Sequence, residues 1–574
     1  MMTQEENTSR PMEQESEWKI RLLDLQMIGC LVTMAVFTNG WANKILITTL
    51  AVIHGFITVY FLEIFTKDRN SNENPDTQSD TNTDRNSGTS PDVNYDQVKT
   101  IDEIPGPLAL PFIGTNWIFY RGVGYYEVDR NHEAYHDLSI RYGQIVRQES
   151  YWNYKIISVF NGKDIETIMK LNTKYPLRPP QDIISHYRLS RKDRYTNSGL
   201  VNEQGLEWEK LRNSLTPGLM SSLTINGFFS SLNTVTDDFV ELIKHRRNEN
   251  DTVVSFEEIA CRFGLESTCM LVLGRRMNFL KTDSTSELTQ KLAKAVRTHF
   301  LATRDAAYGL PTWKYYANAA YKNLIQSEET IYDIISDLIN QTIEENKDVA
   351  QDEAVEAVFQ SILREKTLDN RDKKAAIVDF IAAGIHTIGN TLCFLLHKMG
   401  KHTEVQRQIH EEAQQLAPQR CEVPIKEMRN AKYIKAFIQE VYRLTPTAPD
   451  IARILDQSAT LSNHELPAGT VVLLHTWLAG LNEENFVHAR QLIPERWLEN
   501  SSYQPHSPHL VAPFGYGRRI CPGKRFVDQA LQLAIAKISR AFVVSAEDEL
   551  VLKSEYIMAP QGPVRISFRD IPET

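Results

Sequence analysis

Cysteine is scarce in this chain of 574 residues. The cysteines lie far apart, at Cys30, Cys261, Cys269, Cys393, Cys421 and Cys521. No two of them form a CxxC pair, and six thiols are too few for the dense crosslinking of small secreted proteins. The sequence therefore argues against a disulfide scaffold or a zinc site, and it indicates reduced thiols in a reducing compartment.

Positive charge is also in short supply. Lysine and arginine number 63 against 73 aspartate and glutamate residues, and the formal net charge is -10. A nucleic-acid surface needs a clustered basic excess that displaces counterions from phosphates. We therefore expect no nucleic-acid partner. With 42% hydrophobic residues the chain can still bury a large core.

Long hydrophobic runs are confined to the N-terminal part of the chain. Residues 45–62 form an uncharged run of 18, long enough for one membrane-crossing helix, within an apolar region at 27–65. The shorter apolar stretch at 27–37 leaves a helical hairpin open. The preceding segment, 1–26, is acidic and does not look like an arginine-rich matrix presequence. We expect a membrane-bound protein with its anchor at 27–65.

A polar linker at 66–100 separates this anchor from the rest of the chain. Residues 66–92 contain no aliphatic or aromatic side chain and cannot offset their own ordering entropy, so we expect a flexible tether. Beyond it, from 101 to 574, we find no further linker and expect one large domain. Helical periodicity dominates there and strand-like runs are fewer, which predicts a mainly α fold with a minor β part. The clearest helical segments are 132–142, 230–246, 328–345, 374–398 and 433–443, and the clearest strands are 155–160 and 470–475.

A glycine-rich loop near the C-terminal end presents a single cysteine. Residues 514–523 read Phe-Gly-Tyr-Gly-Arg-Arg-Ile-Cys-Pro-Gly, and the glycines permit tight turns around Cys521. A thiolate held in this way suits a flat metal cofactor, because it donates electron density to haem iron. The alternative is a buried structural cysteine in a glycine-rich turn.

This loop resembles the haem-binding signature of the cytochrome P-450 superfamily at every fixed position of FxxGxRxCxG. Further motifs occur in the order of that family, so the resemblance extends over about 101–574. It implies the cytochrome P-450 fold, with haem between a long oxygen-side helix and the cysteine loop, and Cys521 as the axial ligand of the iron. The resemblance assigns the following residues to haem binding: Cys521, Trp208, Arg212, Arg453, Arg519, Phe514 and Gly517.

Two charged motifs resemble a structural network of the same family. Glu440 and Arg443 stand three residues apart, on one face of a helix, where an acid and a guanidinium can pair. Arg496 resembles the arginine that joins this pair. The resemblance implies a buried network behind the cysteine loop, which shapes the core and does not react.

The stretch Ala383-Gly384-Ile385-His386-Thr387 resembles the proton-delivery motif of the oxygen-side helix. Glycine and threonine there permit a local widening, in which the Thr387 hydroxyl bonds to oxygen or water in place of a backbone carbonyl. The chain departs from the family pattern at His386, which replaces an acid. An imidazole can also relay protons near neutral pH. The alternative is that His386 fills space on a core helix.

The resemblance implies a monooxygenase that inserts one oxygen atom from O2 into its substrate. Stretches at 174–179, 187–191, 205–220 and 311–316 look like the mitochondrial clan, and stretches at 104–119 and 379–391 look like its arthropod steroid hydroxylases. We therefore expect a polyhydroxylated steroid as substrate. Other steroid hydroxylases of the clan remain alternatives, as does a haem-thiolate isomerase or dehydratase that uses neither O2 nor NADPH.

Electron supply and location follow from the same clan. Its members accept electrons from an acidic ferredoxin, served by a ferredoxin reductase, through basic residues near the cysteine loop. Lys524, Arg525 and Lys435 match this role, although Gln439 replaces a second basic helical position, and each could be solvated surface. The hydrophobic anchor resembles instead an endoplasmic-reticulum enzyme with an NADPH-dependent reductase. Both locations stay open.

Overall fold

The computed structural model describes residues 98–571, apart from residues 152–153, 172, 282–285, 346–357 and 418–420. The chain divides into a unit at Met1–Tyr95 and a unit at Asp96–Thr574. The expected segments 1–26 and 27–65, and almost all of the 66–100 linker, lie outside the described residues. The fold described below is that of the second unit.

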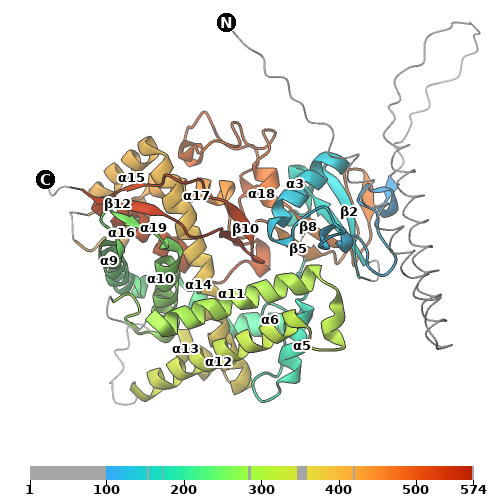
Figure 1. Ribbon diagram of the computed structural model, residues 1–574, viewed down its shortest axis with the longest axis horizontal. Helices are drawn as coiled ribbons and strands as arrows, with labels where there is room; N and C mark the ends of the chain where they lie inside the picture. The colour runs from blue at the N-terminus through green and yellow to red at the C-terminus, as the bar shows by residue number, and fades with distance from the viewer. Residues whose placement is uncertain are drawn as a thin grey trace, which may run out of the picture. The chain divides into compact units, whose positions relative to one another are not determined.

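Helices dominate this unit, and the strands are short. The mainly α fold class with a minor β part is therefore confirmed (Figure 1). Besides α14, the helices that matter for the site or the core are α3 (Asn131–Tyr142), α4 (Gly162–Lys170), α5 (Asp182–Ser190), α6 (Gly205–Leu215), α9 (Phe229–Arg246), α10 (Phe256–Leu273), α11 (Ser286–Tyr308), α12 (Ala319–Glu345), α13 (Val358–Arg364), α15 (Thr403–Leu416), α17 (Lys432–Leu444) and α19 (Lys524–Ala541).

Helix α14 (Asn370–Lys401) is the central helix of the core. The Asp369 side chain caps its N-terminus by accepting a hydrogen bond from the Arg371 backbone N–H at 2.8 Å. Among the described helices, α14 is the one long and apolar enough to cross a membrane, yet 67% of its most apolar stretch is buried inside the domain. Burial by neighbouring helices explains its apolar composition.

Helix α10 crosses α14 at close range, and glycines make the approach possible. A Cβ atom at Gly384 of α14 would lie 2.0 Å from the Thr268 hydroxyl of α10. A Cβ atom at Gly264 of α10 would lie 2.7 Å from the Gly384 carbonyl oxygen. Both contacts are sterically impossible, so the crossing requires glycine at both positions.

Four strands form the largest sheet, in the order β2-β3-β8-β5. Strand β3 pairs antiparallel with β2 and parallel with β8, and β8 pairs antiparallel with β5, in which Arg453 lies opposite Val472. The sheet and α3 lie on one side of the domain, away from α9, α10 and α15 (Figure 1). The strands are β2 (Ile145–Ser150), β3 (Tyr154–Val159), β5 (Ile451–Ile454) and β8 (Val471–Leu474).

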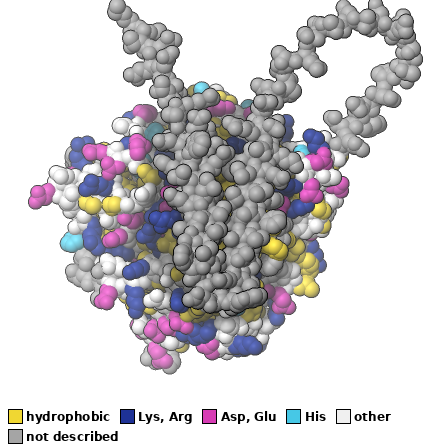
Figure 2. Space-filling view, turned by 45° about the vertical axis from the view of Figure 1, so that its right-hand side comes forward, with side chains coloured by type: hydrophobic (Ala, Val, Ile, Leu, Met, Phe, Trp, Pro, Cys, Tyr) yellow, Lys and Arg dark blue, Asp and Glu magenta, His cyan; other side chains and the backbone are white. Residues whose placement is uncertain are grey.

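The remaining strands form smaller sheets at the edges of the helical core. One of them is the hairpin β10-β11. On the visible part of the surface in Figure 2, positively and negatively charged side chains are interspersed. The smaller sheets are β1 (Lys99–Thr100) with β7 (His464–Leu466) and β6 (Ala459–Leu461), β10 (Leu552–Ser554) with β11 (Met558–Pro560), and β4 (Thr252–Val253) with β12 (Ile566–Asp570) and β9 (Phe542–Ser545).

Candidate haem site

The cysteine loop is a tight turn that leads directly into α19. Gly515 and Gly517 have φ angles of 73° and 63°, in the left-handed region that favours glycine. The Cys521 backbone N–H donates to the Phe514 carbonyl at 2.9 Å and closes the loop. These constraints place Cys521 three residues before the first turn of α19.

The Cys521 thiol faces a space inside the domain. The residue has accessible surface although its sulfur lies deep within the domain, so we infer that this surface faces an internal space. Burial raises the pKa of the thiol above its ordinary value, while the backbone N–H groups of Gly523 and Lys524 and the guanidinium of Arg212 act in the opposite direction. These donors would stabilise a thiolate at the sulfur, which is the form that ligates a metal.

Arginine side chains converge beside the loop without an acidic partner. Burial, and then the charges of Arg178, Arg453 and Arg212, lower the pKa of Arg519 to about 9. No carboxylate within the described part of the chain forms an ion pair with any of these four side chains. Buried like charges are costly unless they are neutralised. The two propionates of haem would supply this missing negative charge, so the residues present fit the cofactor.

Two separate motifs are brought together at this cluster. The Arg519 guanidinium lies 4.3 Å from the centroid of the Trp208 ring, and its Nε donates to the Pro176 carbonyl at 2.9 Å. Arg212 follows Trp208 by one turn of α6 and donates to the Ile520 carbonyl at 2.8 Å. The structure therefore brings Trp208, Arg212 and Arg519 together, as the resemblance implied.

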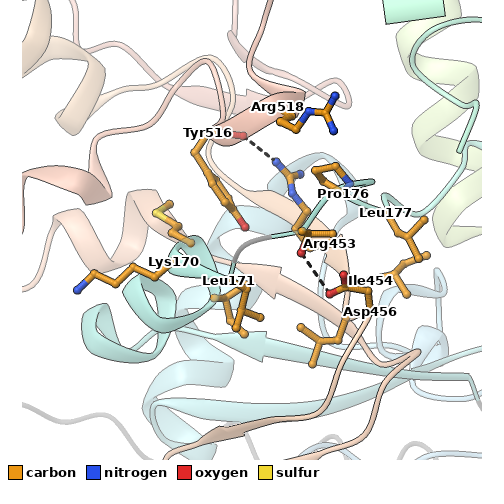
Figure 3. A pocket seen from close by; sticks show the side chains of 14 residues that line it. Lys170, Leu171, Pro176, Leu177, Arg453, Ile454, Asp456, Tyr516 and Arg518 are labelled. Carbon is orange, nitrogen blue, oxygen red and sulfur yellow. Dashed lines mark hydrogen bonds between the residues drawn. The ribbon is translucent and has the colours of Figure 1, made fainter. Parts of the chain in front are cut away.

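Arg453 reaches the cluster from the sheet. Its guanidinium lies 4.6 Å from the centroid of the Tyr516 ring and donates to the Tyr516 carbonyl at 3.4 Å (Figure 3). A pocket of about 340 Å³ adjoins this stack, and Lys170, Pro176 and Arg518 are among its lining residues. Arg453 thus borders both the arginine cluster and this pocket.

Arg178 belongs to the cluster, although its sequence motif did not predict a place in the site. The preceding residue, Leu177, bridges to Ile454 at the end of β5, and the Arg178 backbone N–H donates to the Gln204 side chain at 3.0 Å. These contacts carry Arg178 next to Arg453. The Pro-Leu-Arg-Pro stretch at 176–179 contains Arg178, but in the sequence it indicated only the clan and not a place in the site.

On the opposite side of the cavity, α14 is a continuous helix through its motif. The Thr387 hydroxyl donates to the Ala383 carbonyl at 2.6 Å, and the backbone stays α-helical from Asn370 to Lys401. In this structure the hydroxyl therefore bonds to a backbone carbonyl, and its bond to oxygen or water stays a prediction. Gly384 also serves the close crossing with α10.

His386 does not share the face of Thr387. Its Nε2 lies 2.7 Å from the Ala293 carbonyl of α11, so this nitrogen carries the proton, and Nδ1 accepts from the Cys261 thiol of α10 at 3.4 Å. Burial lowers the pKa of His386, which keeps the ring neutral at physiological pH. Both nitrogens are thus occupied by protein groups, which favours the packing alternative.

The three residues of the expected network meet in the core. Glu440 lies 2.7 Å from Arg443 Nη2 and 2.9 Å from Arg496 Nε, and none of the three side chains is exposed. Glu440 also accepts from the indole N–H of Trp497 at 2.9 Å, and Arg443 donates to the Gly480 carbonyl at 2.8 Å. These bonds compensate the cost of burying the charges.

This network lies behind the cysteine loop. Tyr442, between the two network residues of α17, packs edge-on against Phe514 with 5.5 Å between the ring centroids. The network therefore holds α17 in the position from which it contacts the loop.

The basic residues expected to dock a redox partner all have partners inside the chain. Lys524 pairs with Asp528 at 2.6 Å, and 45% of its side chain is exposed. Arg525 donates to the Met220 carbonyl at 2.9 Å, and Lys435 donates to the Arg429 carbonyl. Their surface is accessible in part, but no contact brings Lys435 together with the other two among the residues described.

Known proteins resemble this chain over most of its length. Ecdysone 20-monooxygenase of Drosophila melanogaster is 43% identical over 488 residues, which cover 82% of this chain and 89% of that protein. Mitochondrial cytochrome P-450 302a1 of Drosophila melanogaster is 28% identical, with coverages of 82% and 96%. Mitochondrial 1,25-dihydroxyvitamin D(3) 24-hydroxylase of Mus musculus is 25% identical, with coverages of 82% and 90%.

The family model of cytochrome P-450 matches residues 104–568. This match spans the cysteine loop, the arginine cluster, the buried network and α14. The chain belongs to the cytochrome P-450 family, and it is a haem-dependent monooxygenase.

Proposed function

We propose that this monooxygenase hydroxylates a steroid, and that its substrate is ecdysone and its product 20-hydroxyecdysone. The observation that carries the proposal is the 43% identity to Drosophila ecdysone 20-monooxygenase over 89% of that protein. The family membership adds that the reaction consumes O2 and that a redox partner delivers the electrons.

The residues of the site have separate roles. Haem held by the Cys521 thiolate would supply the oxidative chemistry. Arg178, Arg212, Arg453 and Arg519 would neutralise and orient the propionates, and the N–H groups of Gly523 and Lys524 would stabilise the thiolate.

Thr387 holds a proton at Oγ1 on the side of α14 that faces the cavity. In the structure this proton is directed to the Ala383 carbonyl, and a rotation of the side chain would release it toward the cavity. We propose Thr387 as the residue that delivers protons to the reacting centre. The contacts of His386 support a positioning role for its ring between α10 and α11.

A haem-thiolate isomerase or dehydratase is the alternative from another class. The argument for this class was that His386 replaces the acid of the proton-delivery motif, since such enzymes often have an altered motif at this place. The hydrogen bonds to Ala293 and Cys261 give this substitution a packing reason, which removes most of that support. Other mitochondrial-clan steroid hydroxylases remain the nearest alternatives.

We further propose a ferredoxin as the electron donor, docking at Lys524, Arg525 and Lys435, and a mitochondrial location. The mitochondrial relatives support this donor. The apolar region at 27–65 supports membrane attachment, and an endoplasmic-reticulum enzyme with an NADPH-dependent reductase is the alternative.

One reconstitution tests these proposals. The purified holoenzyme is supplied with ecdysone and NADPH, with either a ferredoxin and its reductase or the microsomal reductase. We expect O2 and NADPH to be consumed and 20-hydroxyecdysone to form with the ferredoxin system. Product formation without O2 and NADPH would support the isomerase class, and turnover of other steroids but not ecdysone would contradict the substrate.

A further inference from the structure

An accessible stripe runs along one face of α14. Asp379, Phe380, Ala383 and Thr387 keep accessible surface, although most of the helix is buried. Their spacing places them on one face, because positions three and four apart are neighbours on a helix. Ala383 is exposed midway along the central helix of the core, so this face borders an internal space. Thr387 and Ala383 place the stripe on the oxygen side of the haem, where the substrate reacts.

An ion pair occupies one end of this stripe. Arg188 of α5 donates two hydrogen bonds to Asp379, from Nη1 to Oδ2 at 2.8 Å and from Nη2 to Oδ1 at 2.6 Å. Glu328 of α12 lies 3.6 Å from Arg188 Nη2, and the Tyr195 ring centroid lies 5.0 Å from the guanidinium. Four separate segments of the chain therefore fix the orientation of the pair.

The accessible part of this cluster is the Asp379 carboxylate. The Arg188 and Glu328 side chains are 8% and 6% exposed, whereas that of Asp379 is 29% exposed. A carboxylate has about four lone-pair positions, and the two bonds from Arg188 use only two of them. Among the described residues no other side chain donates a hydrogen bond to the remaining positions.

The two carboxylates of this cluster differ in how many donors surround them. Burial acts to raise the pKa of Glu328, but Arg188 and His299, whose Nδ1 lies 3.1 Å away, lower it to about 2. Burial likewise opposes the charge of Arg188, but Asp379 and Glu328 hold its pKa above the ordinary value. Glu328 is thus contacted by Arg188, by His299 and by the Tyr195 hydroxyl, which donates to it at 3.2 Å, whereas Asp379 accepts from Arg188 alone within the described part of the chain. The free acceptor positions of Asp379 favour a substrate group that donates a hydrogen bond, which is a hydroxyl and not a ketone.

We propose that Asp379, held in place by Arg188, selects the substrate by accepting a hydrogen bond from one of its hydroxyl groups. This inference rests on the proposed steroid hydroxylation and deepens it. Asp379 precedes Ala383 by four residues and Thr387 by eight, which is about 6 Å and about 12 Å along the helix axis. The selected hydroxyl is therefore remote from the oxidised carbon. A substrate without it leaves a partly desolvated carboxylate without a donor.

The test compares ecdysone with analogues that each lack one hydroxyl or carry a ketone in its place, using the full-chain holoenzyme. We expect wild-type kcat/KM to fall by about 10- to 100-fold for one of these analogues, the range for a hydrogen bond to a charged group. In Asp379→Asn the ratio of kcat/KM for ecdysone to kcat/KM for that analogue should shrink by at least about 10-fold, because the amide is a weaker acceptor. Asp333→Asn is the matched control, since Asp333 also pairs with an arginine, at 2.8 Å, but is 60% exposed.

Asp379→Asn leaves Arg188 without a full counter-charge, so it perturbs stability as well as selectivity, and a second variant separates the two effects. The double variant Arg188→Met with Asp379→Leu removes both charges and keeps a similar volume, and it should lose the same selectivity. If activity fell equally toward all the steroids and the kcat/KM ratios between them stayed the same, the inference would be overturned. The Arg188–Asp379 pair would then have only a structural role. A wild-type enzyme that does not distinguish the analogues would overturn it as well.

Failure of the proposed function has a different signature. If the wild type does not turn over ecdysone, the substrate proposal fails, and the role of Asp379 is then read from binding alone. Spectral titrations of hydroxy and keto steroid pairs should still show tighter binding of the hydroxy member by wild type and by Asp333→Asn. Equal binding of both members would contradict the role of Asp379 independently of turnover.

Discussion

The guanidinium of Arg519 stacks on the indole ring of Trp208, with 4.3 Å between the guanidinium carbon and the ring centroid. This contact joins the cysteine loop to α6, two segments that are far apart in the sequence. It also holds Arg519 beside Arg178, Arg212 and Arg453, and among the described residues no carboxylate forms an ion pair with these arginines. The cofactor is therefore part of the charge balance of the folded domain.

Haem retention should depend on this arginine cluster. In Arg519→Gln one of the converging charges is lost, and each lost charge-assisted bond to a propionate weakens binding by about 1.5 to 3 kcal/mol, or about 10- to 100-fold. The rate of haem transfer to an excess of apomyoglobin measures this loss. Arg407→Gln, at an arginine of α15 that is 53% exposed, should release haem at the wild-type rate. Equal rates for both variants would place Arg519 outside the haem site.

The axial ligand can be identified by spectroscopy. The reduced, carbon monoxide-bound protein should show the red-shifted Soret band of thiolate ligation, and Cys521→Ser should lack it because a hydroxyl is a much weaker donor. Cys421→Ser, at another exposed cysteine, should keep the band. A Cys521→Ser protein with an unchanged spectrum would show that another residue binds the iron.

The two neighbours in the α14 motif should behave differently. Thr387→Ala removes the hydroxyl that faces the cavity, so NADPH should be consumed with more peroxide and less hydroxylated steroid. His386→Phe should keep its product yield per NADPH, because the His386 ring is bonded to α10 and α11. Its expected cost is stability, about 1 to 3 kcal/mol for the lost buried hydrogen bonds.

The pH dependence separates these roles further. The pKa of His386 is lowered by burial, so the unfolded chain binds a proton below about pH 6.5 that the folded chain resists. The free energy of unfolding should therefore decrease as the pH falls through this window, and less steeply in His386→Phe. The peroxide yield per NADPH should not change across the same pH range. If His386→Phe uncouples as strongly as Thr387→Ala, His386 is a proton relay.

Removal of the central carboxylate should strongly destabilise the core. Glu440→Gln leaves Arg443 and Arg496 buried without a counter-charge, which costs about 3 to 5 kcal/mol. The midpoint of urea unfolding of the haem-bound protein measures this effect. Glu404→Gln also removes an arginine-paired carboxylate, but one that is 65% exposed, and should leave the urea midpoint nearly unchanged because water already screens the pair.

Charge reversal at the proposed docking site should weaken the redox complex. Arg525→Glu should raise the ferredoxin concentration that gives half-maximal turnover. In the wild type the same concentration should rise with salt, because salt screens the electrostatic attraction that guides the acidic ferredoxin to this surface. Lys170→Glu is the control, since Lys170 is 71% exposed and lies on α4. An unchanged requirement in Arg525→Glu would indicate another docking face.

Local periodicity was sufficient to predict most of the secondary structure. The helices expected at 132–142, 230–246 and 433–443 match α3, α9 and α17 to within a residue or two at either end. The strands expected at 155–160 and 470–475 match β3 and β8 equally well. The helix expected at 328–345 begins earlier, at Ala319, because residues 319–327 carry less apolar periodicity than the part buried in the core.

The sequence by itself determined the family and the members of the Glu440 network and predicted Cys521 as the haem ligand, because these rest on fixed spacings within short motifs. Only the tertiary structure decided which side chains meet across segments. It brought Arg178 into the arginine cluster, turned His386 away from Thr387, and set Arg188 against Asp379. These outcomes depend on how closely α10, α5 and α14 pack, and the spacing of residues within one segment carries no information about its neighbours in space.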